Sequence, residues 1–423
     1  MEIQNTNFGP NCFKKLSTME KCYLSNQILC MSKEVFIVDG IRTPIGNFGG
    51  TLGPVRTDDL GALVIKELLE RNPNLDPMLI EDVLFGCANQ AGEDNRNVAR
   101  MSGLLAGLPY QVGGETVNRL CASGMASTIN AARAIKDGAG DIYISGGVEN
   151  MTRGPWVISK VSKPYGRDAE MHDSSFGWRF INPKMEELYG TEGMGMTAEN
   201  LVEKYGIERE AQDQFSLWSQ QKATAAMKSG RLAEEIVAVS IPQRRKDPII
   251  FDTDEFIRTS STIEGLQKSV TAGNSSGLND GAAALLVASE EAVNKFGMKP
   301  LARIVGGAIA GVEPRIMGIG PVYASRKILE RTGLSLDQMD ILELNEAFAA
   351  QVLACTRKMG LEDNDERINP NGGAIALGHP LGMTGARILQ SAAIELQKSN
   401  KRYALVSMCI GVGQGYATIL EKA

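Results

Sequence analysis

Histidine is scarce in this sequence, with only two, His172 and His379, among 423 residues. No apolar run reaches the roughly 18 residues that span a bilayer, so the sequence predicts no membrane segment. Lysine and arginine total 44 against 50 acidic residues, and no net positive field would draw the chain to nucleic acid. With 43% hydrophobic residues, the chain can bury a large core in two or three domains.

The seven cysteines are irregularly spaced and form no CxxC pair. They therefore predict neither a disulfide framework nor a metal site, and they favour a reducing compartment. The carboxyl end, Glu421-Lys422-Ala423, carries no retrieval or peroxisomal tripeptide, so a cytoplasmic enzyme is the simplest interpretation. Residues 1–30 lack the pattern of a signal or transit peptide and are expected to be a disordered extension or the product of an upstream start.

Two similar segments occur in the chain, one in each half. In the first, Cys121 stands three residues before Gly124-Met125, and in the second, His379 stands three residues before Gly382-Met383. Each segment continues as a helical pattern and then a strand. Strands that alternate with helices of this length predict βαβ units with buried sheets and helices outside. We therefore expect an α/β fold whose duplicated βαβ halves are related by a pseudo-twofold axis.

Residues 151–269 interrupt this pattern with an aromatic run, polar helices such as Glu208–Ser229 and the basic cluster Arg244-Arg245-Lys246. This stretch is interpreted as an inserted loop domain. The predicted organisation is an N-terminal half at 31–150 and 270–300, the inserted loop domain at 151–269 and a C-terminal half at 301–423.

Cys121 is the candidate nucleophile. It stands at the start of a predicted helix, where backbone N–H groups and the helix dipole would stabilise a thiolate. The alternative is a small buried cysteine with a packing role. His379 lies on the matching turn of the second repeat, from which it would face Cys121 and accept its proton. The alternative for His379 is a histidine that only caps a loop.

Two further turns carry candidate residues. Cys409 ends the last core strand and is followed by glycines at 411, 413 and 415. This glycine spacing is weak evidence for a nucleotide-binding loop, because a strand-like segment follows instead of a helix. The glycines favour an oxyanion hole. Asn345 follows the strand Ile341–Glu343, where an asparagine is often only a turn residue, but together with the other three it indicates a functional site.

Four ordered motifs resemble those of the thiolase family, and the resemblance extends over essentially all of residues 31–423. The motifs are Val117-Asn-Arg-Leu-Cys121-Ala-Ser-Gly124, Asn345-Glu-Ala-Phe-Ala349, Gly372-Gly-Ala-Ile-Ala-Leu-Gly-His379-Pro-Leu-Gly382 and Cys409-Ile-Gly411. The resemblance implies layered helices and sheets and a two-step acyl transfer through Cys121. In that reaction His379 would activate Cys121, Cys409 would exchange protons with the acetyl-CoA carbanion and with CoA, and Asn345 would hold a water. Backbone N–H groups of Cys121 and Gly411 would form an oxyanion hole.

Coenzyme A is the implied co-substrate, with no metal and no bound cofactor. Arg258 resembles the family's adenine-contacting arginine, although a solvated surface arginine is the alternative. Ser276 resembles its pantetheine-contacting serine, and Met194 a methionine of the substrate pocket. The expected ligands are acyl-CoA substrates, and the expected assembly is a homodimer or homotetramer. The connection Gln267-Lys268-Ser269 is shorter than the family pattern and lacks a pantetheine-contacting phenylalanine, which predicts weaker CoA binding.

Two stretches are most similar to the 3-oxoadipyl-CoA thiolases of aromatic-compound catabolism, in the β-ketoadipate pathway. They are Phe176–Pro183 and Arg315–Pro321. Such enzymes release succinyl-CoA and acetyl-CoA. Arg179 or Arg315 would bind the distal carboxylate of this substrate, because a guanidinium can hold a carboxylate bidentately.

Other functions are compatible with parts of the pattern. One is a thiolase that acts on acetoacetyl-CoA or on the 3-ketoacyl-CoA of fatty-acid β-oxidation. A ketoacyl synthase shares the duplicated fold, but Cys409 argues against it. A non-catalytic CoA- or lipid-binding protein on the same fold is also possible, but the intact set of Cys121, His379 and Cys409 argues against it.

Overall fold

The computed structural model describes residues 33–263, 265 and 273–423. By its contacts the chain divides into Met1–Lys33 and Glu34–Ala423. The extension expected at residues 1–30 and the short connection Gln267-Lys268-Ser269 lie outside the described residues.

Two sets of strands form one large sheet in Glu34–Ala423. The first set is β1 (Val35–Arg42), β2 (Gly46–Asn47), β3 (Asp82–Gly86), β4 (Glu115–Val117), β5 (Ile142–Asn150) and β10 (Asn279–Ser289). The second set is β11 (Ala302–Gly311), β12 (Ile341–Leu344), β13 (Tyr403–Ile410) and β14 (Gln414–Lys422). Their order is β12-β13-β14-β11-β1-β10-β5-β3-β4, with β2 paired to β10, so β11 and β1 join the two sets.

Both sets repeat the same arrangement of strands. In the first, β3 runs parallel to β5 with Val83 beside Ile144, and β5 is antiparallel to β10. In the second, β12 runs parallel to β13 with Ile341 beside Ala404, and β13 is antiparallel to β14. The predicted duplicated α/β fold is therefore confirmed. Counting five residues onward from Ile144 and from Ala404 places Glu149 in β5 at the position that Cys409 occupies in β13.

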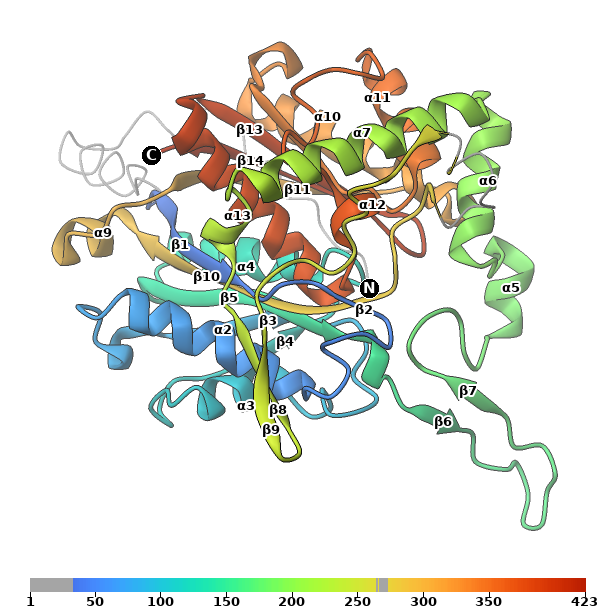
Figure 1. Ribbon diagram of the computed structural model, residues 1–423, viewed down its shortest axis with the longest axis horizontal. Coiled ribbons are helices and arrows are strands. Elements are labelled where there is room, and N and C mark those ends of the chain that lie inside the picture. Colours follow the sequence, from blue (N-terminus) through green and yellow to red (C-terminus); the bar gives the residue numbers. More distant parts are fainter. Residues whose placement is uncertain (1–32, 264, 266–272) are drawn as a thin grey trace, which may run out of the picture. The chain divides into compact units, whose positions relative to one another are not determined.

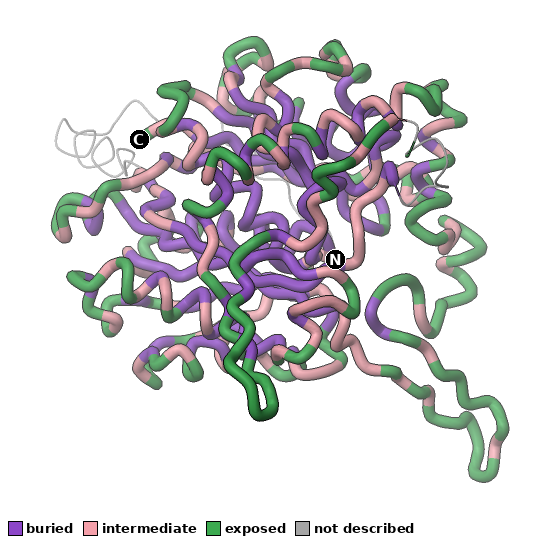
Figure 2. The backbone as a smooth tube through the Cα atoms, in the orientation of Figure 1, coloured by how far each residue is buried: buried purple, intermediate pink, exposed green. Residues whose placement is uncertain are grey.

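Helices fill the space between the strand sets and cover their outer faces (Figure 1), and the buried part of the backbone runs through the centre (Figure 2). In the centre, α4 (Ser123–Asp137) and α13 (Leu381–Ser399) share one core with strands of both sets. A second core lies under α2 (Thr57–Arg71) and α3 (Val98–Leu105), with α9 (Glu290–Phe296) at its edge. A third lies under α10 (Gly320–Thr332) and α11 (Ala349–Met359), beside the short α12 (Ala374–Leu377).

The two central helices cross at glycines. A Cβ on Gly124 of α4 would lie 2.6 Å from the carbonyl oxygen of Gly382, and one on Gly385 would lie 2.3 Å from the backbone nitrogen of Met125. Such close approach leaves no room for a side chain at either glycine. The crossing therefore brings together the helix starts that follow Cys121 and His379.

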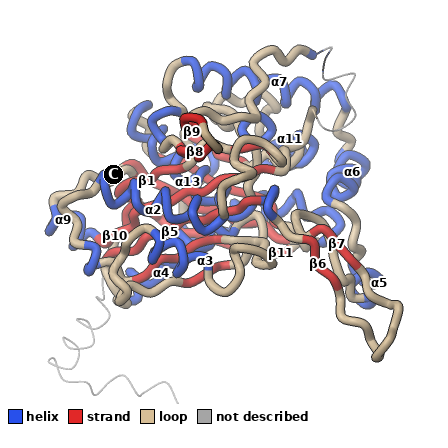
Figure 3. The backbone as a smooth tube through the Cα atoms, turned by 60° about the horizontal axis from the view of Figure 1, so that its bottom comes forward, coloured by secondary structure: helices blue, strands red, loops and turns tan. Residues whose placement is uncertain are grey.

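The described part of residues 151–269 forms helices and two hairpins. The elements are α5 (Pro183–Tyr189), α6 (Met194–Tyr205), α7 (Arg209–Lys228), β6 (Trp156–Ile158) with β7 (Met171–Asp173), and β8 (Val239–Gln243) with β9 (Lys246–Phe251). The polar helix predicted at 208–229 is α7, and the arm that carries β6 and β7 extends away from the sheet (Figure 3). The domain boundaries themselves stay a prediction. Among the described residues, no helix has the length and apolarity needed to cross a membrane.

One buried ion-pair cluster ties the end of this segment to the sheet. The guanidinium of Arg42 in β1 holds Asp254 with two hydrogen bonds of 2.7 and 2.9 Å and Glu235 with one of 2.8 Å. All three side chains are buried, so each charge depends on its partners for stabilisation. The cluster therefore fixes the chain four residues before Arg258.

Candidate active site

Cys121 lies in the turn between β4 and α4 and is 8% exposed. Leu120, just before it, has a φ of 47°, a left-handed conformation that a residue with a side chain adopts only under constraint. Ser123 closes the turn, because its hydroxyl accepts a hydrogen bond from the Arg119 N–H at 2.8 Å and donates to the Leu120 carbonyl at 2.6 Å. The thiol is therefore held at the head of α4, beside the helix crossing.

The turn after β13 brings two more candidates to this thiol. The backbone N–H groups of Gly411 and of Cys121 itself lie near the Cys121 sulfur and act to lower the pKa of its thiol. Cys409 is 1% exposed and packs against Met317, Ala347 and Phe348. Burial raises the pKa of Cys409 well above its ordinary value, and the nearby Cys121 raises it further.

His379 is oriented by hydrogen bonds to its own turn. Its Nδ1 lies 2.8 Å from Thr384 Oγ1, and the Thr384 hydroxyl donates its single proton to the Pro380 carbonyl at 2.7 Å. Thr384 Oγ1 must therefore accept from Nδ1–H, which leaves Nε2 as the unprotonated ring nitrogen. Nε2 lies 3.4 Å from Asn345 Nδ2, so Asn345 and His379 face each other.

Asn345 follows β12 and is 1% exposed. Its Oδ1 has no hydrogen-bond partner among the described residues, so it is free to accept from a bound molecule. The neighbouring Glu346 fixes the turn by accepting hydrogen bonds from Ser219 Oγ at 2.6 Å, Asn369 Nδ2 at 2.7 Å and the Ile375 N–H at 3.1 Å. These hydrogen bonds hold the turn in place, and the amide oxygen of Asn345 beside His379 remains available to a bound molecule.

Burial keeps both Cys121 and His379 uncharged. It raises the pKa of the Cys121 thiol to about 11, although the two backbone N–H donors act to lower it. It also lowers the pKa of His379 to about 3, with a smaller contribution from Arg387. The backbone donors lower the pKa of Cys121, in the direction expected for a thiol at a helix start, but burial outweighs them. The resting pair is a thiol and a neutral imidazole.

Alkylation of Cys121 by iodoacetamide is therefore expected to be slow at pH 7 and to quicken with pH. Only the thiolate reacts, and its fraction rises about tenfold per pH unit below the pKa. The rate is measured from pH 7 to pH 9.5 by quantifying the modified Cys121 peptide by mass spectrometry. A rate that is already constant above pH 7.5 would instead indicate a preformed thiolate–imidazolium pair.

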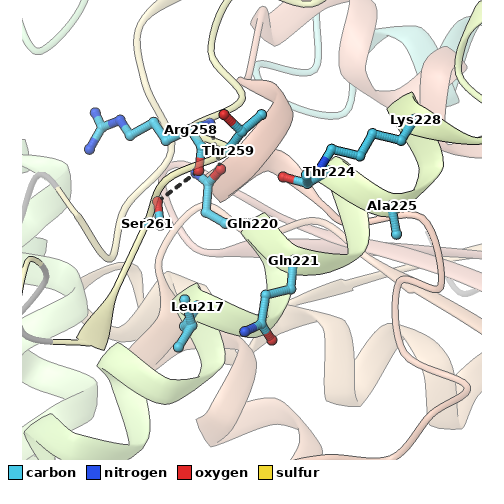
Figure 4. Close-up of a pocket in the computed structure, with 9 residues that line it drawn as sticks. All are labelled: Leu217, Gln220, Gln221, Thr224, Ala225, Lys228, Arg258, Thr259 and Ser261. Carbon is cyan, nitrogen blue, oxygen red and sulfur yellow. Dashed lines mark hydrogen bonds between the residues drawn. The ribbon is translucent and has the colours of Figure 1, made fainter.

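Arg258 lies beside a pocket on α7 (Figure 4). Its backbone N–H donates to Gln220 Oε1 at 2.8 Å, and its guanidinium lies 5.2 Å from the centroid of the Phe256 ring. Lys228 of α7 lines the same pocket, and neither cation forms an ion pair with another described residue. The remaining lining residues are Leu217, Gln220, Gln221, Thr224, Ala225, Thr259 and Ser261. Two unpaired cations suit a ligand that carries phosphate groups.

Replacing Arg258 by alanine is expected to raise the KM for CoA about fivefold, the factor that an exposed ion pair can supply. The kcat should change little because Arg258 makes none of the hydrogen bonds that hold Cys121 and His379. Arg244→Ala, at the exposed tip of the β8–β9 hairpin, is the matched control. Steady-state kinetics with varied CoA would contradict this role if both variants gave the same KM.

The other binding candidates lie on different elements. The Ser276 N–H donates to the Ala347 carbonyl at 3.0 Å, which joins its loop to the Asn345 turn. Met194 begins α6 and is 38% exposed. The structure therefore places Ser276 near the group formed by Cys121, Gly411, Cys409, His379 and Asn345, whereas Met194 and Arg258 belong to the inserted segment.

The two arginines predicted to bind a distal carboxylate differ in their surroundings. Arg315 is already paired with Glu192 at 2.5 Å. Arg179 lies 3.4 Å from both the Ser174 carbonyl and Asn89 Oδ1, and no described carboxylate pairs with it. Among the described residues, the guanidinium of Arg179 therefore has no carboxylate partner, whereas that of Arg315 does.

Sequence reasoning missed two residues at this site, Thr384 and Glu149. Glu149 is 2% exposed, and an acid that ends an apolar strand is a signal that could have been noticed, since a buried carboxylate needs partners. Among the described residues, Cys87, Asp94 and Glu149 hold their ligand atoms within 4.8 Å of one another. Both Glu149 oxygens accept backbone hydrogen bonds and the Cys87 thiol donates to the Asn89 carbonyl, so these groups do not favour a metal.

The chain is similar to known proteins both in sequence and in fold. The family models described as "Thiolase, N-terminal domain" and "Thiolase, C-terminal domain" match residues 35–291 and 298–422. The beta-ketoadipyl-CoA thiolase of Acinetobacter baylyi is 55% identical over 92% of this chain and 100% of its own. The 3-oxoadipyl-CoA/3-oxo-5,6-dehydrosuberyl-CoA thiolase of Escherichia coli is 56% identical over the same shares. Human mitochondrial 3-ketoacyl-CoA thiolase in complex with CoA has a TM-score of 0.85 at 39% identity and covers 92% of this chain and 98% of its own.

Proposed function

The chain belongs to the thiolase family, and on that premise we propose that it cleaves 3-oxoadipyl-CoA with CoA to succinyl-CoA and acetyl-CoA. It is an acyltransferase. The observation that carries the proposal is the cluster in which the Cys121 thiol lies near the Gly411 N–H and Cys409, while His379 and Asn345 face each other on neighbouring turns. The names of the Acinetobacter and Escherichia relatives support the choice of acyl group.

In the first step the Cys121 sulfur attacks the 3-oxo carbonyl carbon, and its proton passes to Nε2 of His379. The backbone N–H groups of Cys121 and Gly411 would hold the oxyanion that forms. The bond between C2 and C3 then breaks, and the succinyl group stays on Cys121. Cys409 gives its proton to the carbanion that leaves as acetyl-CoA, while Asn345 and His379 stabilise the enolate oxygen through the free Oδ1 and a bound water.

In the second step the thiol of CoA replaces Cys121 on the succinyl group. Cys409, now a thiolate, takes the proton from CoA, and the resulting sulfur attacks the thioester carbonyl. Succinyl-CoA leaves, and Cys121 recovers its proton from His379. Both neutral resting groups are therefore regenerated without any redox change.

The reaction is tested by measuring CoA-dependent cleavage of 3-oxoadipyl-CoA, acetoacetyl-CoA and a medium-chain 3-oxoacyl-CoA. The highest kcat/KM is expected with 3-oxoadipyl-CoA. A preference for acetoacetyl-CoA would overturn the choice of acyl group but not the assignment of the protein as an acyltransferase. A cytoplasmic location and a dimeric or tetrameric assembly stay predictions.

Replacing Arg179 by leucine is expected to lower kcat/KM for 3-oxoadipyl-CoA by roughly ten- to hundredfold and to affect acetoacetyl-CoA far less. A lost charge-assisted hydrogen bond to the distal carboxylate is worth about 1.5–3 kcal/mol. Arg315→Leu is the matched comparison, and it should alter neither substrate strongly because Glu192 already neutralises Arg315. An equal loss on both substrates in Arg179→Leu would mean that Arg179 has only a structural role.

A further inference from the structure

Glu149 joins the two halves of the fold next to the reacting groups. Its Oε2 accepts hydrogen bonds from the Ala88 N–H at 2.9 Å and the Gly382 N–H at 2.8 Å, and its Oε1 accepts one from the Asn89 N–H at 2.9 Å. Ala88 and Asn89 follow β3 in the N-terminal half, and Gly382 lies in the first turn of α13 in the C-terminal half. One buried carboxylate therefore holds a helix start of one half against a turn of the other.

The duplication gives this arrangement a counterpart. Glu149 occupies the position in β5 that Cys409 occupies in β13, and Gly382 corresponds to Gly124 by its place in the repeat. Cys409 lies beside the turn that begins α4, and Glu149 binds the turn that begins α13. The end of β13 thus supplies a reactive thiol, Cys409, and the corresponding end of β5 supplies Glu149, whose carboxylate holds the start of α13.

Glu149 binds the chain close to His379. Gly382 is three residues after His379, and its carbonyl oxygen lies where α4 and α13 cross, 2.6 Å from a Cβ built on Gly124. A shift of Gly382 would therefore move both turns at once. We propose that Glu149 is a positioning residue for the reaction under "Proposed function", on which this inference rests, and that its carboxylate fixes His379 Nε2 relative to Asn345 and Cys121.

The charge of Glu149 also acts on the surrounding thiols. Burial raises the pKa of Glu149 to about 7 against the lowering effect of its three backbone donors, and Asp94 raises it slightly further. The titratable groups around it are Asp94, Cys87 and Cys121, and its charge contributes to the raised pKa values of both thiols. Removing the charge should therefore make Cys121 easier to deprotonate while it loosens the His379 turn.

Two substitutions separate the charge from the geometry. Glu149→Gln removes the charge and exchanges one acceptor oxygen for a donor, so kcat should fall roughly ten- to hundredfold, as small misplacements of catalytic groups do. The KM for CoA should change little, and Cys121 should be alkylated faster than in the wild type at pH 8.5. Glu149→Asp keeps the charge but is too short to reach both halves, so kcat should fall while alkylation stays at the wild-type rate.

Asp94→Asn is the matched control, because Asp94 is a buried carboxylate of the same cluster that accepts from the Gly92 N–H and has no part in the reaction as proposed. Its kcat should stay close to that of the wild type.

A wild-type kcat in Glu149→Gln would overturn the inference. Equal acceleration of alkylation in Glu149→Gln and Glu149→Asp would also overturn it, because such a result indicates only a loosened fold. If Glu149→Gln does not fold, the kcat of Glu149→Asp decides. A wild type that cleaves none of the three 3-oxoacyl-CoA substrates would refute the proposed function, whereas the alkylation comparison needs no substrate.

Discussion

Replacing Cys121 by alanine is expected to abolish CoA-dependent cleavage, with a loss on the order of 10⁴-fold or more. Without the sulfur no covalent acyl intermediate can form, so no oxyanion arises for the Gly411 and Cys121 N–H groups to stabilise. The loss is measured as the disappearance of 3-oxoadipyl-CoA with saturating CoA. The fold should survive, because alanine at an 8% exposed turn position removes one small side-chain atom.

Cys355→Ala is the matched control for this variant. Cys355 is also a buried free thiol, but it lies in α11 and donates a hydrogen bond to the Gly318 carbonyl at 3.2 Å. Its replacement should leave most of the activity intact. Residual turnover in Cys121→Ala at more than a few per cent of the wild type would remove Cys121 from its role as nucleophile.

Replacing Cys409 by serine is expected to slow both half-reactions, by roughly 10²- to 10⁴-fold, the range that general acid–base catalysis supplies. A hydroxyl is a much weaker acid and base than a thiol near neutral pH, so it can neither protonate the departing carbanion nor accept the proton of CoA efficiently. Some acylation of Cys121 should persist, because Cys409 does not itself attack the substrate. Stopped-flow measurement of acetyl-CoA release and of thiolysis separates the two steps.

Cys355→Ser makes the same chemical change at another buried thiol and serves as the control. It should turn over at a rate close to that of the wild type. Near wild-type turnover in Cys409→Ser would instead exclude Cys409 from proton transfer, and the ketoacyl synthase interpretation would become the better one.

The repeat in the sequence predicted the relation between Cys121 and His379 because the two motifs have the same spacing to a Gly-Met pair. The glycines at those positions permit α4 and α13 to cross closely, and this crossing brings Cys121 and His379 together. Asn345 was predicted in the same way, from its place at the end of a buried strand. These features depend on residue type and short-range order, which the sequence displays directly.

The contacts that orient these groups could not be predicted. Glu149 binds partners 61 and 233 residues away through backbone N–H groups, which any residue type provides, so no side-chain pattern marks the partners. The net rise in the pKa of Cys121 could not be predicted either. A helix start is visible in the sequence, but the depth of burial that outweighs it arises only when both halves pack around the turn.

The pairing of Arg315 with Glu192 is another feature of packing. Glu192 lies in the loop between α5 and α6, and Arg315 lies in the short 3-10 helix Pro314–Ile319, so no helical spacing brings the two residues together. The sequence therefore left Arg179 and Arg315 equivalent, and only their surroundings separate them.

The most direct test of the proposed function is peptide mass spectrometry of the wild-type protein after incubation with 3-oxoadipyl-CoA in the absence of free CoA. The protein should carry one succinyl group per chain on the peptide that contains Cys121, with an equal amount of acetyl-CoA released. A succinyl group on Cys409 or on another residue, or acetyl-CoA released without any acylated peptide, would contradict covalent catalysis by Cys121.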